Sequence, residues 1–121
     1  MLFIKGKVSG LIDFYFACND FFAYDLAVMI NAWCFEPDGR FSRANSQSLI
    51  AAYAKERPLS VHEISALPIL ARGAALRFLL TRLQDWLEHD AHALVRPKDP
   101  REFAQRLHFH ARVDSAAEYG V

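Results

Sequence analysis

The sequence lacks an excess of charge of either sign, which argues against two classes of partner. Its 121 residues contain 14 Lys and Arg and 14 Asp and Glu, so the formal net charge at pH 7 is zero. Nucleic acids and anionic membrane surfaces attract proteins through an excess of positive charge. We therefore expect neither nucleic acid nor a membrane as a partner.

Cysteines and long apolar runs are also scarce. The two cysteines, Cys18 and Cys34, have no paired spacing, which predicts buried packing residues rather than a disulfide or a zinc site. Polar residues interrupt the most apolar stretch before it reaches the roughly 18 to 20 residues of a membrane helix. The N-terminus places its apolar residues before its charges, unlike a secretory leader. We expect a cytoplasmic protein.

Phenylalanine is abundant and concentrated near the N-terminus. The chain has ten, and six fall within the first 35 residues: Phe3, Phe14, Phe16, Phe21, Phe22 and Phe35. A single domain of this length does not need so much large apolar surface at one end. We expect some of it to be exposed or covered by another chain, for example in a homodimer.

The local patterns predict a mainly α fold, in which a short N-terminal β-hairpin is followed by four or five helices. Short apolar runs at residues 2–4 and 8–12 flank a glycine-containing turn and indicate the two strands. We expect residues 1–20 to form the hairpin and a metal-binding strand end. Residues 21–121 then form a helical subdomain of the same single domain.

The predicted helices are bounded by capping residues and prolines. They cover residues 22–34 with Asn19 or Asp20 as N-cap, and residues 43–56 with Ser42 as cap. Ser60 to Glu63 form a capping box, and Pro68 should divide the following run into a short helix and a long one at about residues 69–91. A last helix should cover residues 102–114, after an Asp99 cap.

Two carboxylates stand out in apolar surroundings. Asp13 directly follows a run that reads as a buried strand, so it should have a partner, and both a metal ion and a simple capping or turn role remain open. Asp25 lies in a helix that is apolar on nearly every side. A buried carboxylate there needs donors such as backbone amides, which makes Asp25 a structural anchor.

Histidines and arginines offer weaker candidates. His89 and His92 are spaced i, i+3 and could ligate a metal, but the pattern favours exposed histidines near a helix C-terminus. His108 and His110 have the pattern of a solvated or packed helix edge. The arginines at positions 72, 77 and 82 spiral around their helix, and one of them could bind a substrate carboxylate.

Several segments together resemble a known family. Gly10-Leu11-Ile12-Asp13-Phe14 followed by Tyr24-Asp25-Leu26-Ala27 is similar to the end of the catalytic core in the aminoglycoside phosphotransferase and choline kinase-like family. Asn31-Ala32-Trp33-Cys34 and the stretch from Arg72 to Leu83 resemble its bacterial homoserine kinases most closely. The similarity covers nearly the whole chain.

The resemblance implies roles for several residues. Asp13 matches the aspartate that holds Mg²⁺ against the ATP phosphates, and Asp25 matches a helix aspartate that supports the catalytic loop. Asn31, Trp33 and Arg82 are the candidate acceptor-pocket residues. The implied parent activity is transfer of the ATP γ-phosphoryl group to the hydroxyl of L-homoserine, in threonine biosynthesis.

The chain also departs from the family pattern. It has no glycine-rich phosphate loop and no His-x-Asp-x-x-x-x-Asn catalytic loop. In the family that loop comes just before the strand at residues 2–4, so we expect the catalytic base upstream of Met1 and no catalytic residue within the chain. The 121 residues alone should bind neither ATP nor Mg²⁺ firmly and should be inactive. A non-catalytic assembly module that dimerises is the alternative.

Overall fold

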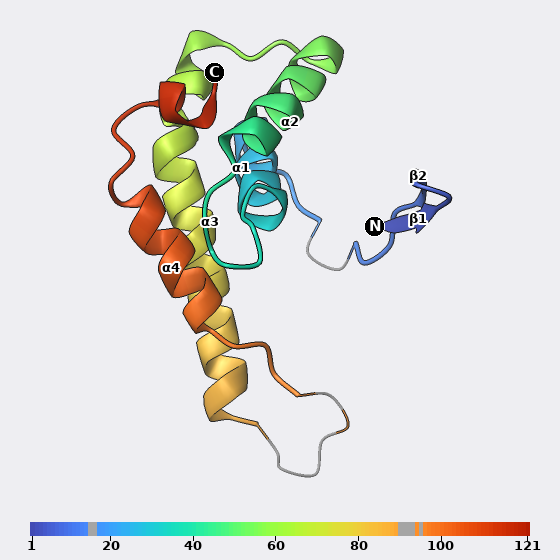
Figure 1. Ribbon diagram of the computed structural model, residues 1–121, viewed down its shortest axis with the longest axis vertical. Coiled ribbons are helices and arrows are strands. Elements are labelled where there is room, and N and C mark those ends of the chain that lie inside the picture. Colours follow the sequence, from blue (N-terminus) through green and yellow to red (C-terminus); the bar gives the residue numbers. More distant parts are fainter. Residues whose placement is uncertain (15–16, 90–93, 95) are drawn as a thin grey trace.

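The computed structural model describes residues 1–14, 17–89, 94 and 96–121, and it confirms a mainly α fold with an N-terminal hairpin (Figure 1). The long helix α3 forms the axis of the molecule, α1 and α4 pack against it, and the hairpin projects away from the helices. The elements in chain order are β1 (Leu2–Ile4), β2 (Lys7–Gly10), α1 (Phe22–Trp33), α2 (Arg43–Glu56), α3 (Val61–Leu87), α4 (Arg101–His110) and a 3-10 turn, η1 (Ala116–Tyr119).

The hairpin is shorter than predicted. Its strands are antiparallel and Phe3 pairs with Val8, while the connecting residues Lys5 and Gly6 have positive φ angles of 49° and 74°. Strand β2 ends at Gly10 and not at Ile12. Because Leu2 already pairs with Gly10, β1 has too few residues left to extend the ladder. Asp13 therefore does not end a buried strand, and the hairpin residues before Gly10 are exposed.

Helix α1 occupies the predicted region, but two details of the prediction were wrong. Phe21 is the N-cap, and the Asp20 carboxylate instead accepts a hydrogen bond from the Phe21 backbone N–H at 2.7 Å. Asp25 is exposed and not buried. The buried residues of α1 follow helical spacing and define the face toward the core, which leaves Asp25 outside it: Ala23, Leu26, Ala27, Ile30 and Asn31.

Helix α2 has the predicted bounds, and Ser42 caps it by accepting from the Asn45 backbone N–H. The capping box at the start of α3 is also confirmed. The Ser60 hydroxyl accepts from the Glu63 N–H at 3.2 Å, and the Glu63 carboxylate accepts from the Ser60 N–H at 2.8 Å. The hydrogen bond that the Glu63 carboxylate accepts from the Ser60 N–H, the ion pair with Arg57 and a further bond accepted from the Ser60 hydroxyl lower the pKa of Glu63 to about 2.

The predicted break at Pro68 does not occur, since α3 runs as one helix from Val61 to Leu87. Pro68 lacks the amide that would bond to the Ile64 carbonyl, which costs the helix one hydrogen bond. Leu67 and Ala71 on either side are completely buried in the core. Burial of these neighbours holds the helix together across the proline. The helix also ends before Ala91, the predicted end.

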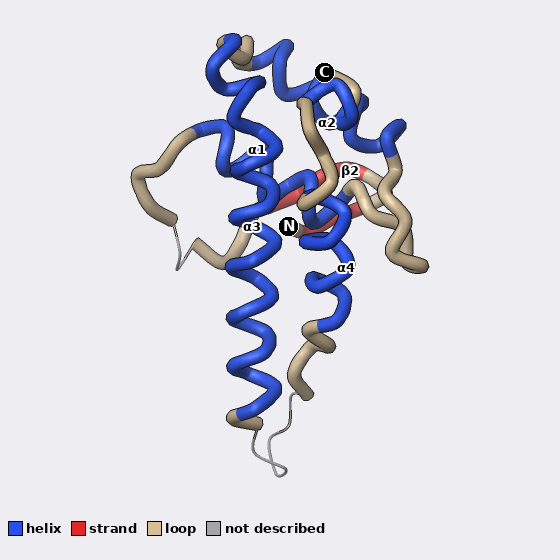
Figure 2. Tube along the Cα trace, turned by 90° about the vertical axis from the view of Figure 1, so that its left-hand side faces the viewer, coloured by secondary structure: helices blue, strands red, loops and turns tan. Residues whose placement is uncertain are grey.

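By length and composition α3 could cross a membrane. A single helix of this kind is weak evidence for that, because core helices of soluble proteins meet the same criteria. In this chain α3 packs against α1 and α4, as Figure 2 also shows from the side, and Leu67, Ala71, Ala74 and Ala75 are fully buried.

The C-terminal segment differs from the single predicted helix. Helix α4 covers Arg101–His110 with Pro100 as N-cap, and the Asp99 carboxylate accepts from the Arg101 N–H at 2.8 Å. The chain then turns into η1, which the sequence patterns did not indicate. Tyr119 of η1 is completely buried against the core, so the turn closes the end of the helical body.

A buried polar chain links four of these elements. His110 Nδ1 lies 2.8 Å from the Tyr119 hydroxyl, and His110 Nε2 lies 3.2 Å from Asn31 Oδ1. The Asn31 amide donates to the carbonyl oxygens of Ala27 and Ala71, both at 3.0 Å. Because Asn31 Oδ1 can only accept, Nε2 carries the proton and Nδ1 accepts from Tyr119. Burial, and secondarily the nearby Arg106 and Arg72, lower the pKa of His110 to about 4.

Two glycines give a matched pair of stability predictions. Gly120 has φ +92°, and a Cβ there would lie 2.9 Å from Gln47 Cβ. We expect Gly120→Ala to lower the free energy of unfolding by roughly 1 to 3 kcal/mol. Gly73 lies in the exposed interior of α3 with open space around it, so Gly73→Ala should raise that energy by about 0.5 to 1 kcal/mol. Urea denaturation of both variants measures the change in the free energy of unfolding. A change of the same sign in both would contradict the account that Gly120 needs its left-handed backbone and Gly73 does not.

Candidate functional site

The two predicted carboxylates line the same cavity. A pocket of about 610 Å³ lies between the segment that precedes α1, the first turns of α1, and α3. We call it the acidic pocket, and its charged lining residues are Asp13, Asp20, Asp25 and Arg77. Aromatic residues of the same segment, among them Phe14, Phe21 and Phe22, complete its wall. The structure therefore places Asp13 and Asp25 at the same pocket, and their implied roles stay predictions.

The position of Asp13 is set by an unusual backbone conformation and not by the end of a strand. It is exposed and has a φ of 71°, a left-handed conformation that aspartate adopts more readily than most residues. Mg²⁺ is commonly held in phosphoryl-transfer sites by one or two carboxylates together with substrate phosphates and water. An exposed carboxylate in a pocket wall fits that donor set, with the phosphates supplying the other oxygens.

The described residues contain no group of three or more His, Cys, Asp or Glu side chains placed to hold a metal ion. A metal at the acidic pocket would thus depend on ligands from the nucleotide. The alternative pair His89 and His92 cannot be assessed as a pair, because His92 lies outside the described residues.

The three candidate acceptor residues do not meet in one place. The Asn31 side chain is completely buried and its amide is used by the polar chain described above. Trp33 is half exposed, and its ring lies 6.1 Å from that of Phe3, edge to face. Arg82 lies on α3 at a second cavity. Their roles in an acceptor pocket remain predictions, and of the three Arg82 lines one of the cavities described here.

That second cavity, the basic pocket, has a volume of about 430 Å³ and lies where α1, α3 and α4 meet. The Glu102 carboxylate pairs with both Arg82 and Arg106. Both guanidinium carbons lie over the Phe103 ring, at 4.4 Å and 4.5 Å from its centroid. The remaining lining residues are Val28, Ala32, Phe78 and Lys98.

Charge in the basic pocket is unbalanced. Desolvation lowers the pKa of Arg106, and the neighbouring Arg82 acts in the same direction against the favourable Glu102. Burial opposes ionisation of Glu102, but its bonds to the two arginines prevail and lower its pKa. Sequence reasoning did not identify Arg106 or Phe103. The i, i+4 spacing of Glu102 and Arg106 was the available signal.

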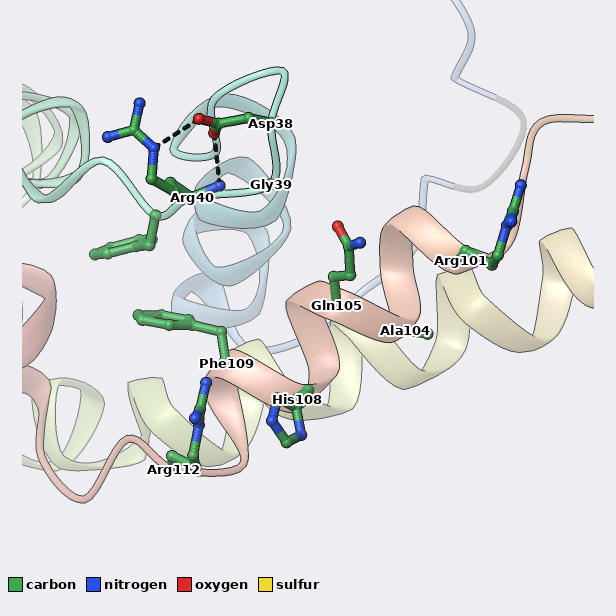
Figure 3. A pocket seen from close by; sticks show the side chains of 10 residues that line it. Asp38, Gly39, Arg40, Arg101, Ala104, Gln105, His108, Phe109 and Arg112 are labelled. Carbon is green, nitrogen blue, oxygen red and sulfur yellow. Dashed lines mark hydrogen bonds and ion pairs between the residues drawn. The ribbon is translucent and has the colours of Figure 1, made fainter.

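A third cavity, of about 580 Å³, lies between α4 and the loop that precedes α2 (Figure 3). Phe41 stacks on Phe109 in its wall, with ring centroids 4.5 Å apart. Arg40 pairs with Asp38, and Arg101 lies at the opposite end of α4 from Arg112. Because these cations do not converge, this cavity is a weaker candidate than the other two.

The two cysteines differ in their environment. Cys34 is buried, as predicted, and burial raises the pKa of its thiol to about 11, with the neighbouring Ser46 acting more weakly in the opposite direction. Cys18 is exposed, so the expectation that it packs in the core was wrong. It lies in the wall of the acidic pocket.

Comparison with known proteins supports the family resemblance. Residues 1–59 match the model of the phosphotransferase enzyme family. The chain is 62% identical over 120 residues to a homoserine kinase of Methylobacterium nodulans, covering 99% of this chain and 37% of that protein. It is 60% identical over 119 residues to a homoserine kinase of Xanthobacter autotrophicus, covering 98% of this chain and 37% of the relative. The chain thus spans little more than a third of the length of these relatives and corresponds to a C-terminal part of them.

Proposed function

We propose that this member of the phosphotransferase enzyme family forms the magnesium-binding and acceptor-binding side of an ATP-dependent kinase that phosphorylates the hydroxyl of L-homoserine. The observation that carries the proposal is the shared position of Asp13 and Asp25 in the acidic pocket. The similarity to homoserine kinases over nearly the whole chain supports the choice of acceptor.

In this proposal each residue has a limited role. Asp13 would hold Mg²⁺, and the bound ion would neutralise negative charge on the ATP phosphates. Asp25, exposed on the first turn of α1, would accept hydrogen bonds from the catalytic loop. The phenylalanines of the pocket wall would exclude water from the region between these two carboxylates.

The catalytic base is proposed to lie outside the chain. No residue here matches the His-x-Asp-x-x-x-x-Asn pattern, so no group in the 121 residues is assigned to accept the proton of the acceptor hydroxyl. The purified chain with ATP, Mg²⁺ and L-homoserine is expected to give no measurable phosphorylation. Turnover that requires both substrates and is abolished by Asp13→Ala would contradict this expectation.

The proposal is tested by a chimera. The 120 residues of the Methylobacterium nodulans homoserine kinase that align with this chain are replaced by this chain, which is 62% identical to them. The chimera should phosphorylate L-homoserine at a rate comparable to that of the parent relative. A folded chimera without turnover would contradict the proposal.

An assembly module that dimerises is a second candidate, favoured by the apolar surface near the N-terminus. The side chains of Phe3, Phe14, Phe21 and Phe22 are each more than half exposed, at 51%, 65%, 75% and 63%. Large apolar side chains that are exposed to this extent are available for contact with a second chain. Sedimentation of the purified chain distinguishes this candidate, because a monomer at high concentration would count against it.

A further inference from the structure

The basic pocket lies next to the acidic pocket, because residues on one face of α1 line both. Asp25 and Val28 line the acidic pocket, and Val28 and Ala32 line the basic pocket. Residues three and four positions apart lie on one face of a helix. From Asp25 to Ala32 the helix rises about 10 Å. On the facing helix, Arg77 lines the acidic pocket and Phe78 the basic one.

The charges of the basic pocket suit a ligand that carries a carboxylate. Three cationic side chains, Arg82, Lys98 and Arg106, line it together with one carboxylate, Glu102. The side chains of Arg82 and Arg106 are only 16% and 11% exposed, so their charge is poorly solvated. Asp99, the nearest other acid in sequence, pairs with Arg101. A second anion would therefore balance the buried positive charge better than Glu102 does alone.

Hydrogen-bond donors also remain for such a ligand. A guanidinium presents several N–H donors in a planar fork that matches a carboxylate. Arg82 uses Nη1 for Glu102 and, at 3.4 Å, for the Asp99 carbonyl, while Arg106 uses Nη2 for Glu102. The Phe103 ring contacts both guanidiniums and is itself packed on Phe78, with centroids 5.2 Å apart.

We propose that the basic pocket binds the α-carboxylate of the amino-acid acceptor through Arg82 and Arg106, so that the acceptor hydroxyl extends along α1 toward the acidic pocket. This inference rests on the proposed function and adds to it the site that selects an amino acid over a simple alcohol. Glu102 competes with the ligand for the same two guanidiniums. Glu102 therefore limits the affinity of the basic pocket for the acceptor.

The test is a titration of the 121-residue chain followed in its backbone amide NMR spectrum, with three probes. L-homoserine carries both carboxylate and hydroxyl, γ-hydroxybutyrate lacks the amine, and aminopropanol lacks the carboxylate. The first two should shift the amides of Ala32, Arg82 and Glu102, and aminopropanol should not. Binding of none of the probes, or equal binding of aminopropanol, would overturn the inference.

Variants separate binding from folding. Arg82→Gln should weaken L-homoserine binding roughly tenfold or more, since one charge-assisted contact is lost. Glu102→Gln should tighten it several-fold, because the competing carboxylate is removed. A purely structural role for Glu102 would not produce tighter binding. Arg40→Gln is the control, because Arg40 also forms an ion pair with a carboxylate but lies outside the pocket, so this change should leave binding unchanged.

The outcomes for this pocket and for the proposed function are distinguishable. Binding of γ-hydroxybutyrate without binding of L-homoserine would retain the carboxylate site and count against homoserine as the acceptor. L-homoserine binding that is unaffected by Arg82→Gln would overturn this inference. Such a result would leave the proposed function to be decided by turnover of the chimera.

Discussion

Asp13→Ala in the chimeric kinase is expected to lower turnover of L-homoserine by on the order of 1,000-fold, since a metal ion contributes several kcal/mol of charge stabilisation and each tenfold in rate corresponds to about 1.4 kcal/mol. The physical reason is the loss of the one carboxylate of this chain that is assigned to Mg²⁺. The measurement is ADP release that depends on L-homoserine at saturating ATP and Mg²⁺.

Asp20→Ala is the control for this experiment. Asp20 lines the same acidic pocket and is also exposed, but its carboxylate accepts a hydrogen bond from the Phe21 N–H and is not assigned to the metal. The Asp20→Ala chimera should keep most of its turnover. Equal losses in the two variants would show that negative charge in the pocket matters in general, and would contradict a specific role for Asp13.

The chain should lose about 3 kcal/mol of stability through His110 as the pH falls from 6.5 to about 4. In the folded chain the pKa of His110 is depressed, so between these values the unfolded chain binds a proton that the folded chain does not. Acid therefore favours unfolding within this window. The contribution is fully present above about pH 6.5, and the decline levels off below about pH 4.

Urea denaturation at several pH values measures this dependence, and two histidine variants isolate it. His110→Gln should remove the part of the pH dependence of the free energy of unfolding that His110 adds between pH 6.5 and 4. His108→Gln should retain it, because His108 lies two residues earlier on α4 and is exposed. Carboxylates titrate in part of the same range, so the difference between the two variants is the informative quantity. Identical slopes in both variants would contradict the burial of a neutral His110.

The elements with strong local signals could be predicted from the sequence. Ser42 and the capping box at Ser60 fixed the starts of α2 and α3, because a side chain that caps a helix acts within three residues of the chain. The hairpin was predicted from its turn, but its length was not, because that depends on how many residues β1 offers for pairing.

Features that depend on tertiary packing could not be predicted. Periodicity did not reveal that Asp25 is exposed, since α1 is apolar on most sides and the packing of α3 decides which face is buried. Burial on both sides of Pro68 kept α3 continuous against the local preference of proline. The contact between His110 and Asn31 joins residues 79 positions apart, and no local pattern indicates it.

Some residues of the candidate site could be identified from the sequence, and others only from the folded structure. The resemblance indicated Asp13 and Asp25, and the structure places both in the acidic pocket. Arg106 was not identified, because its significance comes from Arg82 of α3, which approaches the Glu102–Arg106 pair of α4 only when the two helices pack together. The basic pocket is thus a product of the fold, whereas Asp13 is recognisable from its sequence neighbours.

The proposed role of this chain in phosphoryl transfer is best tested by homoserine-dependent ADP release from the chimera that carries it in place of the aligned part of the Methylobacterium nodulans homoserine kinase. We predict turnover comparable to that of the parent relative, because this chain would then supply the magnesium ligand and the acceptor pocket. A folded chimera that binds ATP but shows no homoserine-dependent ADP release would contradict that role.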